Sequence, residues 1–236
     1  MIGHDDTDRA PAQRVDPMPT IDPAAGLDPT LLNAARVAKG FMPDDEGLAL
    51  AKAALEVASL GPLLEIGTYC GKSSLYLAGP AREAGTVVFT IDHHHGSEEM
   101  QAGWEHHDTS LIDEHTGRMD SSVQFRRTIA DAGVSDVVIG IIGDSPKVAH
   151  HWNTPLSLVF IDGAHSYEPA LADYLGWSPH VVPGGYLVFH DVFEDPDFGG
   201  QGPWQVYCEA ISSGVFSPVR TVGSMRILVR SDGPTR

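Results

Sequence analysis

The chain has 236 residues, of which 42% are hydrophobic and 20% are charged, and its formal net charge is −17 at pH 7. These values fit one globular domain and exclude a wholly disordered chain. The negative charge argues against nucleic acid and anionic membrane surfaces as partners. Two cysteines are too few for a disulfide framework. Neither a secretory segment nor an apolar run of about 18 residues is visible, which favours a cytoplasmic protein.

Residues 1–30 are rich in Asp, Pro and Ala and show no periodicity. We expect them to form a flexible amino-terminal arm that a partner subunit orders, ahead of a single domain over residues 31–236. Helical spacing of apolar residues then predicts a helix over residues 31–37 and a second helix that begins at Asp44 or Asp45.

Five short apolar runs follow, and amphipathic segments separate them. Such runs, without polar alternation, are typical of parallel strands buried on both faces. The predicted strands are Pro62–Ile66, Thr86–Ile91, Val137–Ile142, Leu156–Ile161 and Tyr186–Phe189. The predicted helices between them are Ser73–Ala84, Ser122–Ala132, Pro146–His150 and Glu168–Trp177. The alternation predicts an open α/β sheet with right-handed crossovers.

The end of the chain adds a predicted helix over Trp204–Ser213 and two strand-like runs, Ser217–Val222 and Met225–Arg230. The glycine and serine between these runs predict an antiparallel hairpin at the sheet edge. Residues 93–121 form a polar insertion that holds six of the twelve histidines. Because α/β sheets place ligand-covering loops at such strand ends, we expect a lid over the substrate. The alternatives are a zinc site, which no CxxC or HExxH pattern supports, and a solvated loop.

Gly67 and Gly71 follow the first predicted strand and precede a helix. Two glycines let the backbone turn tightly and approach a ligand, and the helix start offers N–H groups to an anion. The spacing matches neither the G-x-G-x-x-G nucleotide fingerprint nor a Walker loop, and the strand acid Glu65 is expected in neither. This counts against a nicotinamide-dependent oxidoreductase, which stays open as an alternative.

The run E-I-G-T-Y-C-G-K-S-S, residues 65–74, resembles motif I of the class I S-adenosylmethionine (SAM) methyltransferases. It is most similar to the metal-dependent O-methyltransferases of the catechol, caffeoyl-CoA and macrocin types, over roughly residues 40–230. The resemblance implies a Rossmann-like fold with a mostly parallel seven-stranded sheet and a carboxyl-terminal antiparallel hairpin. It also implies that the loop holds the methionine part of SAM, that Ser73 meets its carboxylate and that Met42 lies near the methyl donor. The cofactor residues expected in this part of the chain are Met42, Glu65, Gly67, Tyr69, Gly71 and Ser73.

Further cofactor contacts are expected at the next two strand ends. Asp92 ends the second strand, where an acid can accept hydrogen bonds from both ribose hydroxyls, although a turn role is the alternative. The resemblance implies that Asp144 and Ser145, after the third strand, border the adenine: Asp144 would accept from its amino group and Ser145 would donate to the ring. A helix cap before Pro146 is the alternative there.

Asp162 and Asp191 end the fourth and fifth strands, and their oxygens suit Mg²⁺. The resemblance implies that Asp162, which also borders the cofactor, holds the metal together with His190 and Asp191. His190 stands where an acid is common, which shifts the preference towards Mn²⁺. Alternatively, His190 donates a hydrogen bond to a ligand residue or helps bind substrate.

His165 lies three residues beyond Asp162, an offset that in the family carries the general base. Histidine suits this role because its ordinary pKa is about 6.5. A helix-start histidine bonded to the backbone is the alternative. We therefore expect a homodimeric SAM-dependent, divalent-metal-dependent O-methyltransferase that acts on a hydroxyl of a sugar or polar natural product. A phenolic acceptor and a non-catalytic metal-binding protein remain alternatives.

Overall fold

The computed structural model describes residues 27–97, 100–101, 103–104 and 107–231. Most of the expected arm lies outside these residues. Its last part belongs to the packed domain, because Leu27 is buried and helix α1 already begins at Pro29. Asp28 caps that helix by accepting hydrogen bonds from the N–H groups of Thr30 and Leu31.

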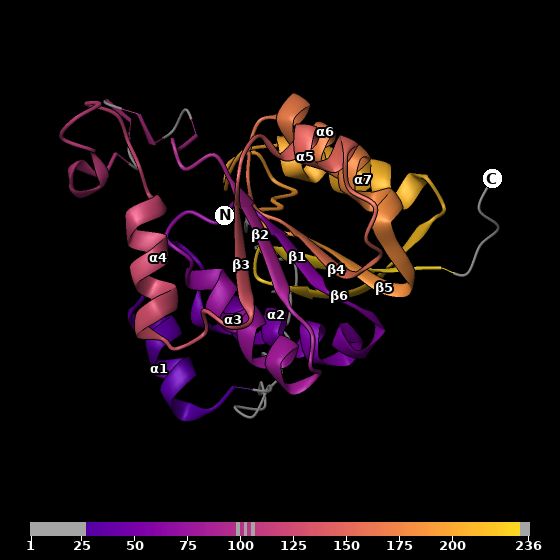
Figure 1. Ribbon diagram of the computed structural model, residues 1–236. Helices are drawn as coiled ribbons and strands as arrows, with labels where there is room; N and C mark the ends of the chain where they lie inside the picture. The colour runs from indigo at the N-terminus through magenta and orange to yellow at the C-terminus, as the bar shows by residue number, and fades with distance from the viewer. Residues whose placement is uncertain (1–26, 98–99, 102, 105–106, 232–236) are drawn as a thin grey trace, which may run out of the picture.

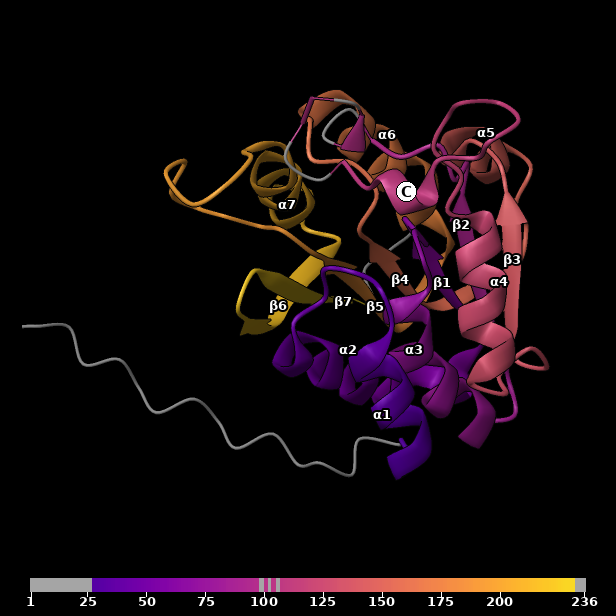
Figure 2. The same ribbon diagram turned by 90° about the vertical axis from the view of Figure 1, so that its left-hand side faces the viewer.

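Seven strands form one sheet in the order β3-β2-β1-β4-β5-β7-β6. The first five strands of this order run parallel to one another, and the last two form an antiparallel hairpin whose β7 pairs with β5. Figure 2 shows β6 and β7 at the opposite side of the sheet from β3. The strands are β1 Leu63–Ile66, β2 Val88–Asp92, β3 Val138–Ile142, β4 Leu156–Ile161, β5 Val181–Phe189, β6 Phe216–Val222 and β7 Met225–Arg230. This confirms the predicted mostly parallel sheet with its terminal hairpin.

Helices cover both faces of the sheet (Figure 1). One face carries α1 Pro29–Val37, α2 Asp44–Val57, α3 Lys72–Glu83 and α4 Ser122–Asp131. The other face carries α5 Ser145–His150, α6 Tyr167–Trp177 and α7 Gly202–Ser212. Short 3₁₀ turns lie at Ala58–Leu60, Thr109–Leu111 and Ser178–His180. Within the described residues, no helix combines the length and apolar character needed to cross a membrane.

The hydrophobic core consists of two layers, one on each side of the sheet. Successive strand residues point to opposite faces, so Phe160 packs towards α1–α4 while Val159 packs towards α5–α7. Burial of both faces of the central strands explains why their sequences read as continuous apolar runs. The acids Asp92, Asp162 and Asp191 lie at the carboxyl ends of these strands or directly after them.

The insertion between β2 and α4 packs over the glycine loop. Leu111 and Met119 form a small buried cluster with Cys70, which belongs to that loop. Lys39, just before α2, reaches Asp108 of the insertion with a 2.5 Å ion pair. The base of the insertion is therefore attached to the two segments that border the site.

Candidate active site

A cleft lies at the carboxyl ends of the parallel strands and has two lobes. The larger lobe has a volume of about 580 Å³ and the smaller one of about 270 Å³. Both lobes share a wall that includes Gly67, Tyr69, Asp162 and His165. The larger lobe alone contains Asp92, Asp144, Ser145 and Asp173, and the smaller lobe alone contains Met42, Ser73, His190 and Asp191. The sheet thus brings nearly all predicted site residues to one place.

The glycine loop lets two strand ends come unusually close. Gly67 has a φ of +94°, and a Cβ on it would lie 2.2 Å from the carbonyl oxygen of Asp162. Gly71, with a φ of +87°, caps the start of α3. Only glycine fits at this position, because any side chain would collide with the backbone of Asp162. The segment after β1 can therefore lie directly against the segment after β4.

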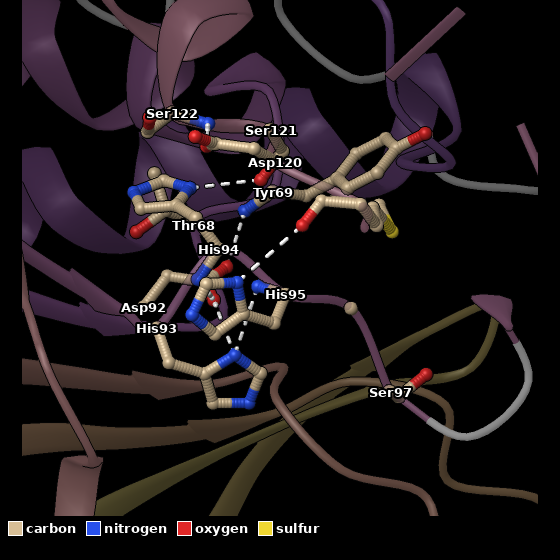
Figure 3. Close-up of polar contacts among 12 residues, drawn as sticks. Thr68, Tyr69, Asp92, His93, His94, His95, Ser97, Asp120, Ser121 and Ser122 are labelled. Atoms are coloured by element: carbon tan, nitrogen blue, oxygen red, sulfur yellow. Dashed lines mark hydrogen bonds and ion pairs between the residues drawn. The ribbon is translucent and has the colours of Figure 1, made fainter. Parts of the chain in front are cut away.

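Asp92 lies in the wall of the larger lobe and is fixed by the backbone (Figure 3). The N–H of Tyr69 donates to Oδ2 at 2.8 Å, and the N–H of His94 donates to Oδ1 at 2.7 Å. The side chain remains 15% exposed. Its remaining lone pairs can therefore accept hydrogen bonds from a ligand, as the ribose prediction requires.

Two predicted cofactor residues, Glu65 and Gly71, lie behind the described walls of both lobes. Glu65 is fully buried and accepts hydrogen bonds from the hydroxyls of Ser74 and Thr90. Its Oε1 has no hydrogen-bond partner among the described residues, and burial raises the pKa of Glu65 to about 7. The carboxyl group thus holds the start of α3, next to the glycine loop, through its hydrogen bond with Ser74. Direct contact of Glu65 with a cofactor stays a prediction.

The wall of the larger lobe contains a buried acid, Asp173, that the sequence did not reveal. Asp173 accepts a 2.5 Å hydrogen bond from the hydroxyl of Ser145, which in turn accepts one from Trp177. Burial raises the pKa of Asp173 to about 6. The Ser145 hydroxyl proton is thus directed at Asp173, so a contact of Ser145 with an adenine ring would use another atom. Asp144 is the cap residue of α5 by position, but its side chain pairs with Lys147 at 2.9 Å.

Asp162, His165 and Asp191 place ligand atoms within 4.8 Å of one another, which is close enough for all three to bind one cation. The Nε2 of His165 lies 2.9 Å from Oδ2 of Asp191. Two carboxylates and an imidazole at this spacing fit a divalent metal. The grouping contains His165 in place of His190, the histidine predicted as a ligand.

His190 is surrounded by carboxylates. Its Nδ1 lies 3.0 Å from Asp162 and 3.3 Å from Asp191, while its Nε2 lies 2.5 Å from Glu46. Burial alone would lower the pKa of His190, but these carboxylates raise it well above its ordinary value. The hydrogen bonds from His165 and His190 in turn outweigh burial and lower the pKa of Asp191. This geometry favours the alternative in which His190 donates to the acidic residues.

Glu46 is the second site residue that the sequence did not reveal. It lies in α2 and is 3% exposed, and it accepts hydrogen bonds from His190 and from the N–H of Ser224 in the hairpin turn. In the sequence, Glu46 is one of three consecutive acids at the start of α2, where acids are common, whereas Asp173 is an acid in a largely apolar stretch of α6. Neither pattern identifies the distant partner.

A family model described as a methyltransferase domain matches residues 64–192. Three solved structures share the fold at low identity. The SAH-bound methyltransferase from Podospora anserina is 15% identical, with a TM-score of 0.60 over 88% of this chain and 89% of that one. The SAM-bound O-methyltransferase TomG from Streptomyces achromogenes is 20% identical, with a TM-score of 0.56 over 87% and 91%. The O-methyltransferase from Bacillus cereus in complex with SAH is 21% identical, with a TM-score of 0.57 over 86% and 92%. These likenesses confirm the expected Rossmann-like fold.

Proposed function

The chain belongs to the methyltransferase domain family, and from this premise we propose that it transfers a methyl group from SAM to a hydroxyl of a sugar or polar natural product. One observation carries the proposal. The lobe suited to a nucleoside and the lobe with the acid–histidine cluster share one wall, at Asp162 and His165. A methyl donor in the first lobe would therefore present its methyl group to an acceptor held in the second.

The two lobes together supply contacts for each part of the donor. Asp92 accepts from the ribose hydroxyls, and Asp144 accepts from the adenine amino group. The backbone around Gly67 admits the methionine part, which extends towards Met42 and Ser73 in the smaller lobe. The acidic wall also favours the positive sulfonium centre.

In the smaller lobe, Asp162 and Asp191 would hold a divalent cation, Mg²⁺ or Mn²⁺. When bound, such an ion lowers the pKa of a coordinated hydroxyl. His165 accepts the proton of the acceptor hydroxyl, and Asp191, 2.9 Å from its Nε2, orients the ring. The acceptor oxygen forms a bond with the methyl carbon as the carbon–sulfur bond breaks, and the electron pair stays on sulfur. This displacement needs an oxygen about 3–3.5 Å from the methyl carbon.

Polar surroundings favour a saccharide acceptor, which the histidine-rich insertion would cover. The composition of the chain and the position of His165, which is similar to that in the macrocin type, suggest the mycobacterial methylmannose polysaccharide 1-O-methyltransferase as one candidate, so this polysaccharide belongs among the acceptors tested. A phenolic acceptor is the second candidate, because Phe41 stacks on Tyr69 at 5.5 Å and Trp104 is 53% exposed. These rings offer flat faces to an aromatic substrate.

The test is a methyl-transfer assay with labelled SAM against sugar, phenol and amine acceptors, with and without EDTA. We expect a sugar hydroxyl to be methylated, activity to be lost in EDTA and Mg²⁺ or Mn²⁺ to restore it. Asp162→Ala should abolish turnover, and His165→Ala should lower turnover while SAH affinity is kept. Asp131→Ala, an exposed acid outside the cleft, is the matched control.

Each part of the proposal has its own contrary result. If calorimetry finds no SAH binding, the methyltransferase proposal fails, and binding of a nicotinamide nucleotide would favour an oxidoreductase. Full activity in EDTA contradicts the metal role. Methylation of phenols alone supports the second acceptor class.

A further inference from the structure

Three non-glycine residues of the described chain have a left-handed backbone, and all three lie at or beside the cleft. They are Tyr69, His94 and Asp191, with φ values of 47°, 61° and 51°. This conformation is costly for most residues, and histidine and aspartate tolerate it better than most others. Two of the three, Tyr69 and His94, donate the hydrogen bonds that hold Asp92. The strain is thus concentrated around the acid assigned to the ribose.

The two backbone donors fix the Asp92 carboxylate through separate oxygens (Figure 3). His94 lies only two residues after Asp92, so its N–H reaches the side chain through a tight turn. The left-handed φ of His94 sets the direction in which the chain leaves this turn. If the backbone at His94 shifted, its N–H would move away from Oδ1 and this oxygen of Asp92 would lose its donor.

Several contacts hold His94 in this conformation. Its side chain is 3% exposed, its Nδ1 lies 2.8 Å from the hydroxyl of Ser121, and its ring stacks on Phe125 at 5.6 Å. The N–H of Ser121 also donates to the carbonyl oxygen of His94 at 3.1 Å. We refer to this pair of contacts between His94 and Ser121 as the clasp. The clasp joins the first residues of the insertion to its last one, just before α4.

We propose that His94 is a positioning residue for ribose recognition. The clasp holds the backbone of His94 where its N–H donates to Asp92, and so it keeps Asp92 directed towards the two ribose hydroxyls, although His94 itself need not touch the cofactor. The inference rests on the proposed function, since it takes Asp92 as the ribose acceptor. It predicts that side-chain changes at the clasp alter the affinity for the ribose hydroxyls and leave the rest of the cofactor site in place.

The test compares the affinities of SAH and its 2′,3′-dideoxy analogue, which lacks both hydroxyls that Asp92 would bind, by calorimetry on the full chain. Hydrogen bonds to a carboxylate should make wild-type binding of SAH at least about tenfold tighter than binding of the dideoxy analogue. Ser121→Ala and His94→Ala should weaken SAH binding by about tenfold but leave the affinity for the analogue nearly unchanged. The ratio of the two affinities then falls towards one.

Two more variants at position 94 separate the backbone from the ring. His94→Asn should keep most of the discrimination, because asparagine tolerates the left-handed region and offers a polar group to Ser121. His94→Gly permits the same backbone conformation but removes the side-chain contact of the clasp, so it should resemble His94→Ala. The matched control is His151→Ala, which changes an exposed histidine at the carboxyl end of α5 and should leave the ratio unchanged.

An unchanged ratio in Ser121→Ala overturns the inference, even if His94→Ala fails to fold. Equal losses for SAH and the analogue also overturn it, because they indicate a general structural role. In both cases wild-type binding of SAH leaves the proposed function intact. If the wild-type chain binds no SAH at all, the proposed function fails and the inference fails with it.

Discussion

The carboxylate of Asp191 contacts His165 and His190, and the backbone of Asp191 has a left-handed conformation. Asp191→Asn tests its charge with little change of shape, because asparagine also tolerates this conformation. We expect turnover at saturating substrate to fall by about 100-fold or more, with SAH affinity within about twofold of wild type. Steady-state kinetics and calorimetry measure the two quantities. Turnover close to wild type would contradict the role given to this acid.

Glu65 gives the stability of the protein a pH dependence of known sign. Burial raises its pKa to about 7, above the ordinary value, so the folded state keeps a proton that the unfolded chain releases. Its stabilising contribution is fully present below the ordinary pKa and is lost as the pH rises through about 7. Between pH 5 and pH 8 this loss amounts to about 2 kcal/mol of the free energy of unfolding.

Glu65→Gln should remove this loss, since the amide does not titrate and can still accept from Ser74 and Thr90. Urea unfolding of both proteins at pH 5 and pH 8 provides the comparison. Other titrating groups are common to the two proteins and cancel in the difference. Equal pH dependence in the two proteins would show that Glu65 is ionised in the folded chain.

Some site residues could be predicted from sequence and others could not, for a geometric reason. Asp92, Asp162 and Asp191 follow buried strands, and parallel strands place their carboxyl ends at one edge of a sheet. Glu46 and Asp173 lie in helices, and their partners come from elements far away in the chain. Helical periodicity can show that such an acid faces the core, but it does not show which distant residue will be its hydrogen-bond partner.

At the scale of elements, the apolar runs predicted the positions of the strands, but they did not predict where β5 begins. The strand begins at Val181, five positions before the expected Tyr186. Pro183 and the two glycines after it are typical of a turn, yet Val181 still pairs with Leu156 across an irregular register. Tertiary pairing overrode the local signal. The order of the strands also lay beyond the sequence pattern, since it depends on which distant strands pair.

The hairpin between β6 and β7 holds α2 through its turn. Gly223 has a φ of +52°, and a Cβ there would lie 2.0 Å from Oε1 of Glu46. Gly223→Ala should therefore combine backbone strain with displacement of Glu46, and we expect a loss of about 2–4 kcal/mol in the free energy of unfolding. Urea denaturation measures it.

Gly214→Ala is the matched control, because its φ is +70° and nothing lies within 4 Å of the added Cβ. It should show the backbone cost alone, about 1 kcal/mol. If both variants lose the same amount, Glu46 is not held firmly by the hairpin turn.

At the scale of the whole molecule, the net charge of −17 sets a dependence on salt. The folded state concentrates these charges, and raising NaCl from 10 to 150 mM shortens the screening length from about 30 to about 8 Å. We expect the free energy of unfolding to rise by roughly 1 kcal/mol over this range. A decrease would instead mean that exposed ion pairs such as Arg36–Asp44 outweigh the repulsion.

The central place of β1 in the sheet also affects the synthesis of the chain. Leu63 pairs with Val88 on one side and with Leu158 on the other, and Gly67 packs against Asp162. As the chain leaves the ribosome, β1, β2 and β3 can assemble while β4 does not yet exist. The nascent chain then exposes the apolar edge of β1, which can pair with other chains and aggregate. The cleft is complete only after both β4 and β5 have been made, because Asp162 follows the first and Asp191 follows the second, so the protein gains its binding site late in synthesis.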